Sequence, residues 1–183
     1  VILQSLTSTD LSHTAFPFMS SQEITVGDIK VRATRLTYVG ELGWELYVPV
    51  EQGLELWEKI MAAGKAQGIK ACGYRAIESL RLEKGYRAWA GEINTETNPY
   101  EAGLGFAVSL KKEKFHGKEA AIAAQSNLSR KLVAITFDDI TCVPFGSEPI
   151  RIGSKIVGRI KSGGQGYTIK KAIAYAYLPI EHT

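Results

Sequence analysis

RLTYVGELGWELYV, residues 35–48, is the stretch that decides the fold. Alternating residues that favour β-strands stand on both sides of a short glycine-containing segment, residues 39–43, and this arrangement predicts a β-hairpin. Side chains on the return strand point alternately to opposite faces, so one face should be apolar: Trp44, Leu46 and Val48. Glu45 and Tyr47 take the other face. We interpret Glu45 as a recognition residue, because a carboxylate beside an aromatic ring is suited to contact a ligand.

The composition is that of a globular protein with an ordinary core. Of the 183 residues, 45% are hydrophobic and 22% are charged, and the net charge of +3 without a long Lys/Arg run gives no indication of nucleic-acid binding. No apolar run approaches the ~20 residues that a membrane-spanning helix needs. Two cysteines, Cys72 and Cys142, form neither a disulfide framework nor a zinc set, so we expect buried, reduced thiols.

Helical periodicity predicts three helices, over residues 51–67, 74–84 and 116–125. The first helix should bury a stripe of four residues: Leu54, Trp57, Ile60 and Met61. The second should bury another set: Tyr74, Ile77 and Leu80. Gly68 and Gly85 are expected to end these two helices. Residues 89–99 form a long polar loop between the second helix and the third.

Short runs of β-favouring residues predict strands in both parts of the chain. Before and after the first helix they are residues 23–29, 30–38 and 69–72, and after residue 130 they are 132–137, 150–152, 156–161 and 172–178. The SGGQG run at 162–166 lacks the Gly-Lys-Ser/Thr ending of a phosphate loop, so we expect a tight turn there. The fold class is therefore α+β. An α+β region over residues 1–126 should precede a small antiparallel β-barrel-like domain over residues 127–183.

Arg75 stands in the first turn of the second predicted helix, where a cation meets the positive end of the helix dipole. One explanation is an ion pair with Glu78 three residues later, which would contribute only ~0.2–0.5 kcal/mol. The other is a carboxylate or phosphate site, because free N–H groups and a guanidinium together bind anions well. The residues alone leave both explanations open.

Several common sites are missing from the sequence. No GxGxxG motif opens a helix, and the three histidines are scattered, so we expect no dinucleotide site and no metal site. No Ser/His/Asp or Cys/His arrangement suggests itself. Five residues remain as a candidate site: Tyr38, Glu41, Glu45, Arg75 and Phe106.

These residues carry a resemblance to a known family. Residues 35–45 resemble the Gly-Tyr-Thr-Gly-Glu-x-Gly-x-Glu signature of the glycine-cleavage T-protein (aminomethyltransferase) family. Gly73-Tyr-Arg75 with Ser79-Leu-Arg-Leu-Glu-Lys-Gly85 is similar to a second signature of that family, and Asn98-Pro-Tyr-Glu-Ala-Gly-Leu-Gly-Phe106 is similar to a third. Within the family, residues 84–89 and 97–102 most resemble the folate-binding C-terminal region of dimethylglycine and sarcosine dehydrogenases. The fold implied is a partial T-protein folate-binding domain followed by the family's C-terminal β-barrel domain.

The resemblance implies that tetrahydrofolate is the cofactor. Glu45 takes the position of the family's pterin-binding glutamate, and a carboxylate accepts the pterin's paired N–H donors well. Arg75 takes the position of the arginine that holds the folate's glutamate tail. Phe106 stands where the family has an aromatic ring against the folate, and Tyr38 is the signature tyrosine. The implied function is capture of a methyl-derived one-carbon unit as 5,10-methylene-tetrahydrofolate.

The resemblance also implies what this chain does not contain. The family's catalytic aspartate should lie upstream of Val1, so we assign no catalytic residue here. The FAD-binding portion of the dehydrogenases should lie upstream as well, and an upstream flavoprotein domain is the partner expected. Family members occur in the mitochondrial matrix and in the bacterial cytoplasm, and the sequence does not choose between these locations.

Three other functions compete with folate-dependent transfer in a dehydrogenase-like protein. A free-standing aminomethyltransferase of the glycine cleavage system would need a lipoyl carrier protein as partner. An iron–sulfur maintenance protein would carry Lys-Gly-Cys-Tyr/Phe-x-Gly-Gln, but Lys84-Gly-Tyr86 has no cysteine at that place. A structural module would use the motif residues only for packing. Loss of folate binding on substitution of Glu45 and Arg75 would separate the first hypothesis from the last.

Overall fold

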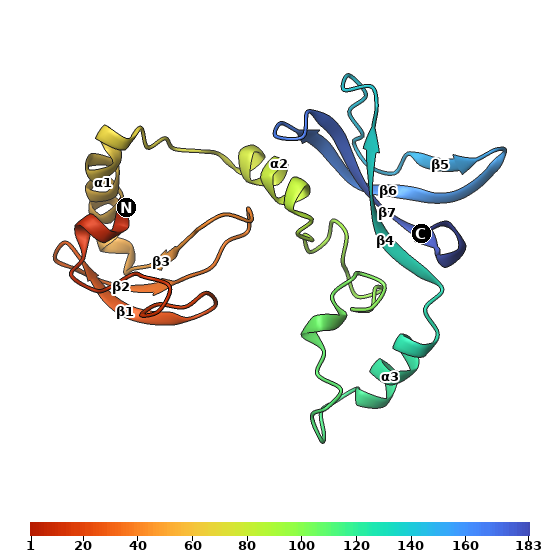
Figure 1. Ribbon diagram of the computed structural model, residues 1–183, viewed down its shortest axis with the longest axis horizontal. Coiled ribbons are helices and arrows are strands. Elements are labelled where there is room, and N and C mark those ends of the chain that lie inside the picture. The colour runs from red at the N-terminus through yellow and green to blue at the C-terminus, as the bar shows by residue number, and fades with distance from the viewer. The chain divides into compact units, whose positions relative to one another are not determined.

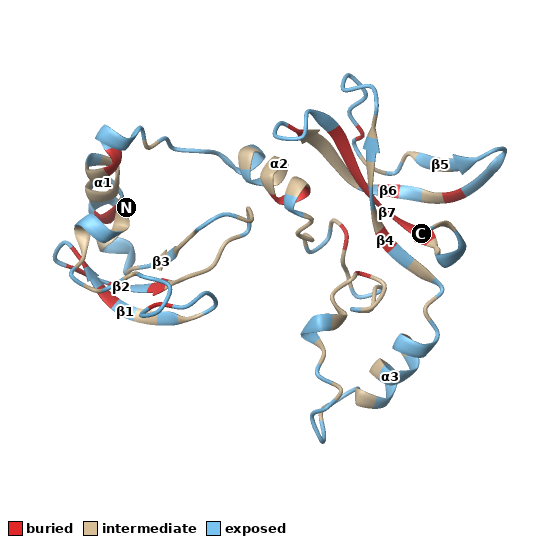
Figure 2. Cartoon of the chain, in the orientation of Figure 1, coloured by how far each residue is buried: buried red, intermediate tan, exposed pale blue.

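The computed structural model describes residues 1–183, and the chain forms two compact units, Val1–Ile77 and Glu78–Thr183 (Figure 1). Each unit has its own hydrophobic cluster. Buried residues gather on strands β1 and β2 of the first unit and on β7 of the second (Figure 2). No helix is both long and apolar enough to cross a membrane. The predicted division at residues 126/127 stays a prediction.

The first unit is built on a three-stranded antiparallel sheet in the order β1-β2-β3. Its strands are β1 (Ser21–Val26), β2 (Ile29–Thr34) and β3 (Glu45–Tyr47), and a short 3-10 helix, η1 (Leu3–Leu6), precedes them. Burial alternates along β1 and β2 as the pleat requires, with Ile24, Val26, Ile29 and Val31 in the core. The turn between them contains Gly27 at a φ of 63°, a conformation that glycine adopts without strain.

The hairpin between β2 and β3 is wider than the sequence suggested. Thr34 pairs with Glu45, so β2 ends at Thr34 and residues 35–44 form an irregular connection. The prediction of a strand through residue 38 and a tight turn at 39–43 was therefore wrong. Arg35 is bonded through its backbone to Met19 and Ser20, and its guanidinium binds the Phe16 carbonyl (Nη1–O 2.7 Å). These contacts hold the start of the irregular connection against residues 16–20.

Helix α1 (Gly53–Gly64) follows the sheet and is extended at both ends by 3-10 turns, η2 (Val50–Gln52) and η3 (Lys65–Gln67). Gly68 ends the run in the left-handed conformation, as predicted. The predicted buried stripe was only partly right: Ile60 packs against the core cluster, but Leu54 is 69% exposed and Trp57 52% exposed. Leu56, which the prediction did not include, is buried. Residues 69–72 form no strand, contrary to the prediction.

Helix α2 (Tyr74–Lys84) has the predicted bounds, and Gly85 follows it at a φ of 81°. The predicted inward face was wrong in part: Tyr74 is exposed, and the buried residues are Arg81 and Leu82. The boundary between the two compact units falls within this helix, after Ile77. Beyond it the chain has little regular structure until α3 (Lys118–Ser126), apart from the 3-10 turn η4 (Gly105–Ala107).

The second unit contains a four-stranded antiparallel sheet in the order β4-β7-β6-β5. Its strands are β4 (Arg130–Phe137), β5 (Pro149–Ile152), β6 (Lys155–Gly166) and β7 (Lys171–Pro179), and the chain ends in a 3-10 turn, η5 (Ile180–His182). The strand β7 lies inside the sheet and is buried over residues 172–178. Mixed helices and antiparallel sheets confirm the predicted α+β class.

The glycine-rich run at 162–166 belongs to strand β6, so the predicted tight turn was wrong. Its glycines serve close packing: a Cβ on Gly163 would lie 2.7 Å from the Pro144 carbonyl oxygen. Ser162 and Gly164 nevertheless pair with β7 in register, opposite Tyr175 and Ile173. A glycine-rich segment here is a tightly packed strand and not a loop.

Candidate functional site

Glu45 lies on β3 with its side chain on the exposed face of the strand. The Tyr47 hydroxyl, two residues along the same face, donates a hydrogen bond to Glu45 Oε2 (2.5 Å). This hydrogen bond and the negative charge of Glu45 raise the pKa of Tyr47 above its ordinary value. Glu45 Oε1 accepts no hydrogen bond within the unit. The carboxylate is thus held by a neighbour on one oxygen and presents the other to solvent.

The opposite face of β3 is anchored in the core, as the alternation predicted. Trp44 and Leu46 pack against the buried cluster, and the Trp44 ring meets the Phe16 ring edge to face, with centroids 4.7 Å apart. The Arg35 guanidinium lies 5.7 Å from the Trp44 ring centroid, in a cation–π arrangement. Because these contacts fix the apolar face of β3, they also fix the direction in which Glu45 points.

Arg75 is the second residue of α2 and is exposed. Its guanidinium makes no ion pair, because Glu78 binds Arg81 instead. The first backbone bond at this helix start runs from the Ala76 N–H to the Gly73 carbonyl (3.0 Å). A free guanidinium therefore stands beside helix N–H groups that have no carbonyl partner, which is the chemistry of an anion site.

The two aromatic residues of the predicted site lie in different units. Tyr38 is in the first unit, in the connection of residues 35–44 that leads into β3 and Glu45. Phe106 is in η4 of the second unit and is 88% exposed. Three of the four predicted cofactor residues thus belong to one unit, and the position of Phe106 relative to them stays a prediction.

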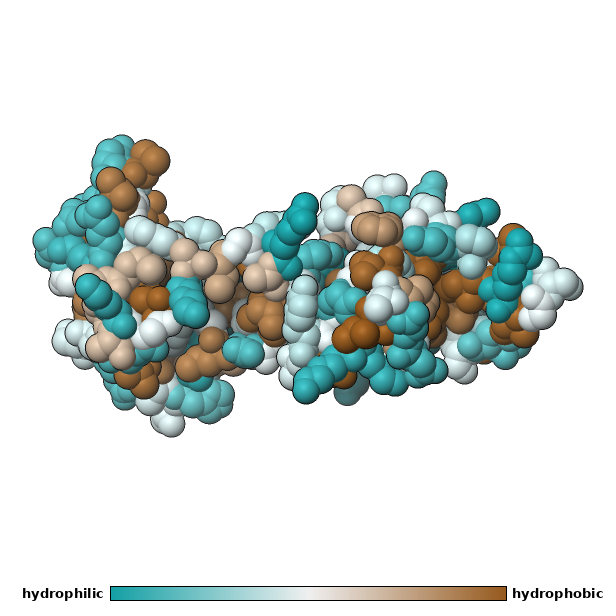
Figure 3. Space-filling model, turned by 90° about the horizontal axis from the view of Figure 1, so that it is seen from above, coloured by the Kyte–Doolittle hydropathy of each residue, from teal (hydrophilic) through white to brown (hydrophobic).

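Cavities and exposed apolar side chains give further detail about the surface. A groove of about 570 Å³ in the first unit lies on the core side of β3, lined by Leu42, Trp44 and Leu46 among others, and Glu45 does not line it. Apolar side chains interrupt the polar surface in several places (Figure 3). Both cysteines are exposed, so the expectation of buried thiols was wrong. No group of three or more His, Cys, Asp or Glu residues is placed to hold a metal ion.

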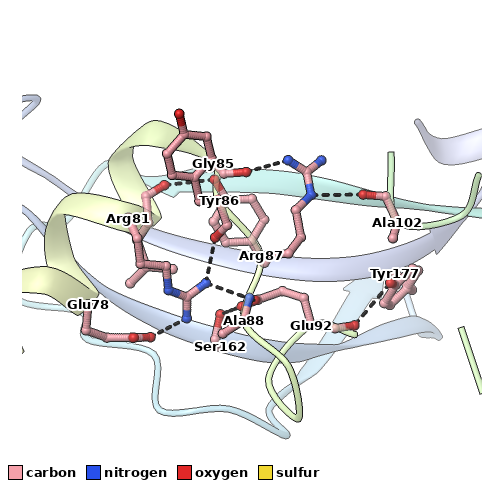
Figure 4. A network of polar contacts seen from close by, with 12 residues as sticks. Glu78, Arg81, Gly85, Tyr86, Arg87, Ala88, Glu92, Ala102, Ser162 and Tyr177 are labelled. Atoms are coloured by element: carbon pink, nitrogen blue, oxygen red, sulfur yellow. Dashed lines mark hydrogen bonds and ion pairs between the residues drawn. The ribbon is translucent and has the colours of Figure 1, made fainter. Parts of the chain in front are cut away.

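Sequence reasoning missed a buried ionic network in the second unit, shown in Figure 4. Arg81 and Glu92 are each only 1% exposed, and Arg81 Nη1 lies 2.8 Å from Glu92 Oε2. Glu92 also accepts hydrogen bonds from the Ala88 N–H (2.7 Å) and from the Ser162 hydroxyl. Burial alone would lower the pKa of Arg81, but hydrogen bonds and negative charge from Glu78 and Glu92 outweigh it and raise that pKa.

The network ties the loop after α2 to the helix and to the sheet. Arg81 Nη1 donates to the Tyr86 carbonyl (3.1 Å), and the Tyr177 hydroxyl on β7 donates to the Glu92 carbonyl (3.1 Å). The signal in the sequence was the position of Arg81, four residues after Ile77 on a helix face predicted to be apolar. Glu92 gave no such signal, because it stands in a polar loop that is expected to be exposed.

Comparisons with known proteins agree over almost the whole chain. A family model described as "GCVT N-terminal domain" matches residues 1–112, and one described as "Glycine cleavage T-protein C-terminal barrel domain" matches residues 130–183. The chain is 44% identical to dimethylglycine dehydrogenase of Mus musculus, over 98% of this chain and 21% of the relative. It is 41% identical to sarcosine dehydrogenase of the same species, over 97% of this chain and 19% of the relative.

The match covers a larger share of the bacterial relatives and of a related solved structure. The chain is 38% identical to an aminomethyltransferase of Symbiobacterium thermophilum, over all of this chain and 49% of the relative. The crystal structure of glycine cleavage system aminomethyltransferase T from Bartonella henselae superposes with a TM-score of 0.79 at 28% identity, over 90% of this chain and 45% of that chain. The chain thus spans about half the length of the aminomethyltransferases and about a fifth of the dehydrogenases that it matches.

Proposed function

The chain belongs to the glycine cleavage T-protein family, and on this premise we propose that it is the tetrahydrofolate-binding, one-carbon-transfer part of a dimethylglycine/sarcosine dehydrogenase-like enzyme. In that enzyme it captures the methyl-derived one-carbon unit as 5,10-methylene-tetrahydrofolate. The observation that carries the proposal is the Glu45 carboxylate, which is exposed, oriented by Tyr47 and mounted on a strand whose other face is fixed in the core.

The residues present fit a reduced folate. Its pterin presents an N–H beside an amino group, and a carboxylate accepts such a pair in parallel. Glu45 offers this acceptor, since Oε1 has no partner and Oε2 takes one hydrogen bond from Tyr47. Bound folate would supply its N5 and N10 nitrogens as acceptors of the one-carbon unit.

Arg75 supplies the second polar contact of the proposal. The folate's glutamate tail carries carboxylates, and Arg75 combines an uncommitted guanidinium with the start of α2. We assign Tyr38 and Phe106 to contacts with the folate rings, where aromatic surfaces contribute most of the apolar burial. Glu45 and Arg75 thus fix the orientation of a ligand that is bound mainly by apolar contact.

The dehydrogenase-like assignment is favoured over a free-standing T-protein by the pattern of identity. Identity is 41–44% with dimethylglycine and sarcosine dehydrogenases and 35–38% with aminomethyltransferases from three bacteria. In the dehydrogenase-like protein, the FAD chemistry and the catalytic acid belong to other parts of the enzyme. The chain described here holds the acceptor cofactor.

An aminomethyltransferase of the glycine cleavage system is the second candidate. The observation in its favour is the match to both family models together with the TM-score of 0.79 to the Bartonella henselae protein. The two candidates differ in the partner that delivers the one-carbon unit, a flavoprotein portion of the same protein or a separate lipoyl carrier protein. A full-length protein that binds FAD and turns over an N-methyl amino acid without a lipoyl carrier would support the first candidate.

The test of folate binding uses Glu45→Ala and Arg75→Ala, with titration calorimetry under anaerobic conditions. Each substitution should weaken tetrahydrofolate binding at least about tenfold, because each removes a charge-assisted hydrogen-bonding group. Glu51→Ala and Lys65→Ala are matched controls, since both residues are exposed and lie outside the proposed site. Unchanged affinity in both site variants would contradict the proposal and favour a purely structural role for the motif residues.

Two fragments of the cofactor sharpen this test. Tetrahydropterin has the ring system without the tail, so Glu45→Ala should weaken its binding while Arg75→Ala leaves it unchanged. p-Aminobenzoylglutamate has the tail without the pterin, so Arg75→Ala should weaken its binding while Glu45→Ala leaves it unchanged. If both variants lost both fragments equally, the assigned roles would be wrong.

A further inference from the structure

A basic pocket of about 420 Å³ in the second unit has no role in the proposed function. Strands β4, β6 and β7 line it with Arg130, Arg159, Lys161 and Tyr177, together with a set of small or apolar residues: Ile156, Val157, Gly158 and Pro179. All of these residues belong to the second unit, so the pocket is formed within one compact body. Its size lies within the range of small-molecule sites.

The charge of the pocket is one-sided. Three cations and no acidic residue line it. The second unit as a whole carries 15 Lys and Arg residues against 11 Asp and Glu residues, whereas the first carries 7 against 8. The positive charge of this chain is therefore concentrated in the unit that contains the pocket.

Arg130 is held rigidly at the edge of the pocket. Its Nε lies 2.9 Å from Glu101 Oε1 and its Nη2 lies 3.3 Å from Glu101 Oε2, so the guanidinium and the carboxylate meet side by side. The guanidinium also lies 5.0 Å from the centroid of the Tyr177 ring. Nη1 is left without an acceptor, so Arg130 offers N–H donors that are oriented before any ligand binds.

Arg159 and Lys161 supply the excess charge. Arg159 Nη1 donates to the Ser147 carbonyl (2.9 Å), which leaves its Nε and Nη2 groups uncommitted. Lys161 makes no hydrogen bond or ion pair through its ammonium group, and no carboxylate is paired with either residue. Glu101 neutralises the charge of Arg130 but not the charges of Arg159 and Lys161. Two unpaired positive charges therefore line the pocket.

We propose that this pocket is a second ligand site, which binds a small anion with at least two acidic oxygen-bearing groups, carboxylates or phosphates. One such group pairs with Arg159 and Lys161, and the other takes the free Nη1 donors of Arg130. Tyr177 contributes its ring surface and not its hydroxyl, because the hydroxyl already donates to the Glu92 carbonyl. The site is independent of the Glu45 and Arg75 contacts.

The test uses the complete 183-residue chain with two probes, pyrophosphate and tricarballylate, in titration calorimetry at low salt. Arg159→Gln/Lys161→Gln should weaken binding of the preferred probe at least about tenfold, since it removes the two unpaired cations. Arg151→Gln/Lys155→Gln is the matched control, because it removes the same charge from two exposed residues of the same sheet that do not line the pocket. The control should change affinity by less than about twofold.

The two probes distinguish phosphate from carboxylate ligands, and preference for either supports the site. Raised ionic strength should weaken the binding, because the cations are exposed. Amide resonances of Gly158 and its neighbours should shift on saturation. Absence of saturable binding of both probes, or equal loss in the two double variants, would overturn the proposal. Neither result bears on the folate site, whose test uses other residues and another ligand.

Discussion

Arg81 on α2 and Glu92 in the loop that follows form an ion pair that is almost completely buried, with Nη1 2.8 Å from Oε2. Two charges out of water are tolerated when every remaining donor and acceptor finds a partner. Glu92 meets that condition through Ala88 and Ser162. Arg81 meets it at both terminal nitrogens, through Tyr86 and Glu78, but its Nε has no partner. The pair therefore organises the loop around it and makes the loop sensitive to loss of either partner.

Replacement of one partner should be strongly destabilising. Glu92→Gln removes the negative charge without changing the size of the side chain, so buried Arg81 keeps only the partly exposed Glu78 carboxylate as a counter-charge. We expect a loss of about 3–5 kcal/mol in the free energy of unfolding, measured by urea denaturation. Asp138→Asn is the control in the same unit, because it breaks an exposed ion pair with Lys171 and should cost at most about 1 kcal/mol. If both variants lost the same free energy of unfolding, the buried pair would contribute no more to stability than the exposed pair does.

The Glu101–Arg130 pair should make stability depend on pH in the acid range. Burial raises the pKa of Glu101, but the hydrogen bonds from Arg130 and Asn98 and the charge of Arg130 outweigh it, and the net pKa is lowered. A lowered pKa in the folded state gives stability that is complete above the unfolded value of about 4.3 and is lost as pH falls through the folded value. Urea midpoints of wild type and Glu101→Gln should therefore differ most above the unfolded value of about 4.3, and should approach each other as pH falls through the lower folded pKa of Glu101.

Arg130→Gln is the companion to that measurement. It removes the cation that lowers the pKa of Glu101 and leaves the opposing effect of burial, so the loss of stability at acid pH should be smaller in Arg130→Gln than in wild type. If the difference in urea midpoint between wild type and Glu101→Gln stayed the same down to the most acidic conditions, this pH dependence could not be assigned to Glu101.

The elements that the sequence predicted well are those with a local cause. The bounds of α2 follow from its periodicity and from Gly85, and the outward direction of Glu45 follows from strict alternation on β3. The errors have tertiary causes. The connection after β2 begins with contacts of Arg35 to residues 16–20, and the burial of Glu92 depends on Arg81 and Ser162, from two other segments. A short local pattern of apolar or polar residues does not predict partners that come from distant parts of the chain.

Strand β6 offers a direct test of close packing by glycine. Gly163→Ala would place a Cβ 2.7 Å from the Pro144 carbonyl oxygen, so either the 144 segment or the strand must move. We expect a loss of about 1–3 kcal/mol in the free energy of unfolding. Gly91→Ala is the control, because its Cβ would meet Ala88 Cβ at an ordinary 3.4 Å, and it should cost less than about 1 kcal/mol. An unchanged free energy of unfolding in Gly163→Ala would show that the segment around Pro144 moves at little cost in free energy.

The Tyr47–Glu45 contact should be visible as a titration shift that needs no ligand. The Tyr47 hydroxyl donates to the Glu45 carboxylate, and both this hydrogen bond and the nearby negative charge raise the pKa of Tyr47. Glu45→Gln removes the charge and weakens the acceptor, so the pKa of Tyr47 should fall toward the ordinary tyrosine value of about 10. NMR of ring-labelled tyrosine follows the titration residue by residue, and Glu51→Gln, an exposed change outside the contact, should leave Tyr47 as in wild type. An unshifted Tyr47 in Glu45→Gln would mean that the two side chains do not meet in solution, and that Glu45 reaches a ligand without the orientation that Tyr47 provides.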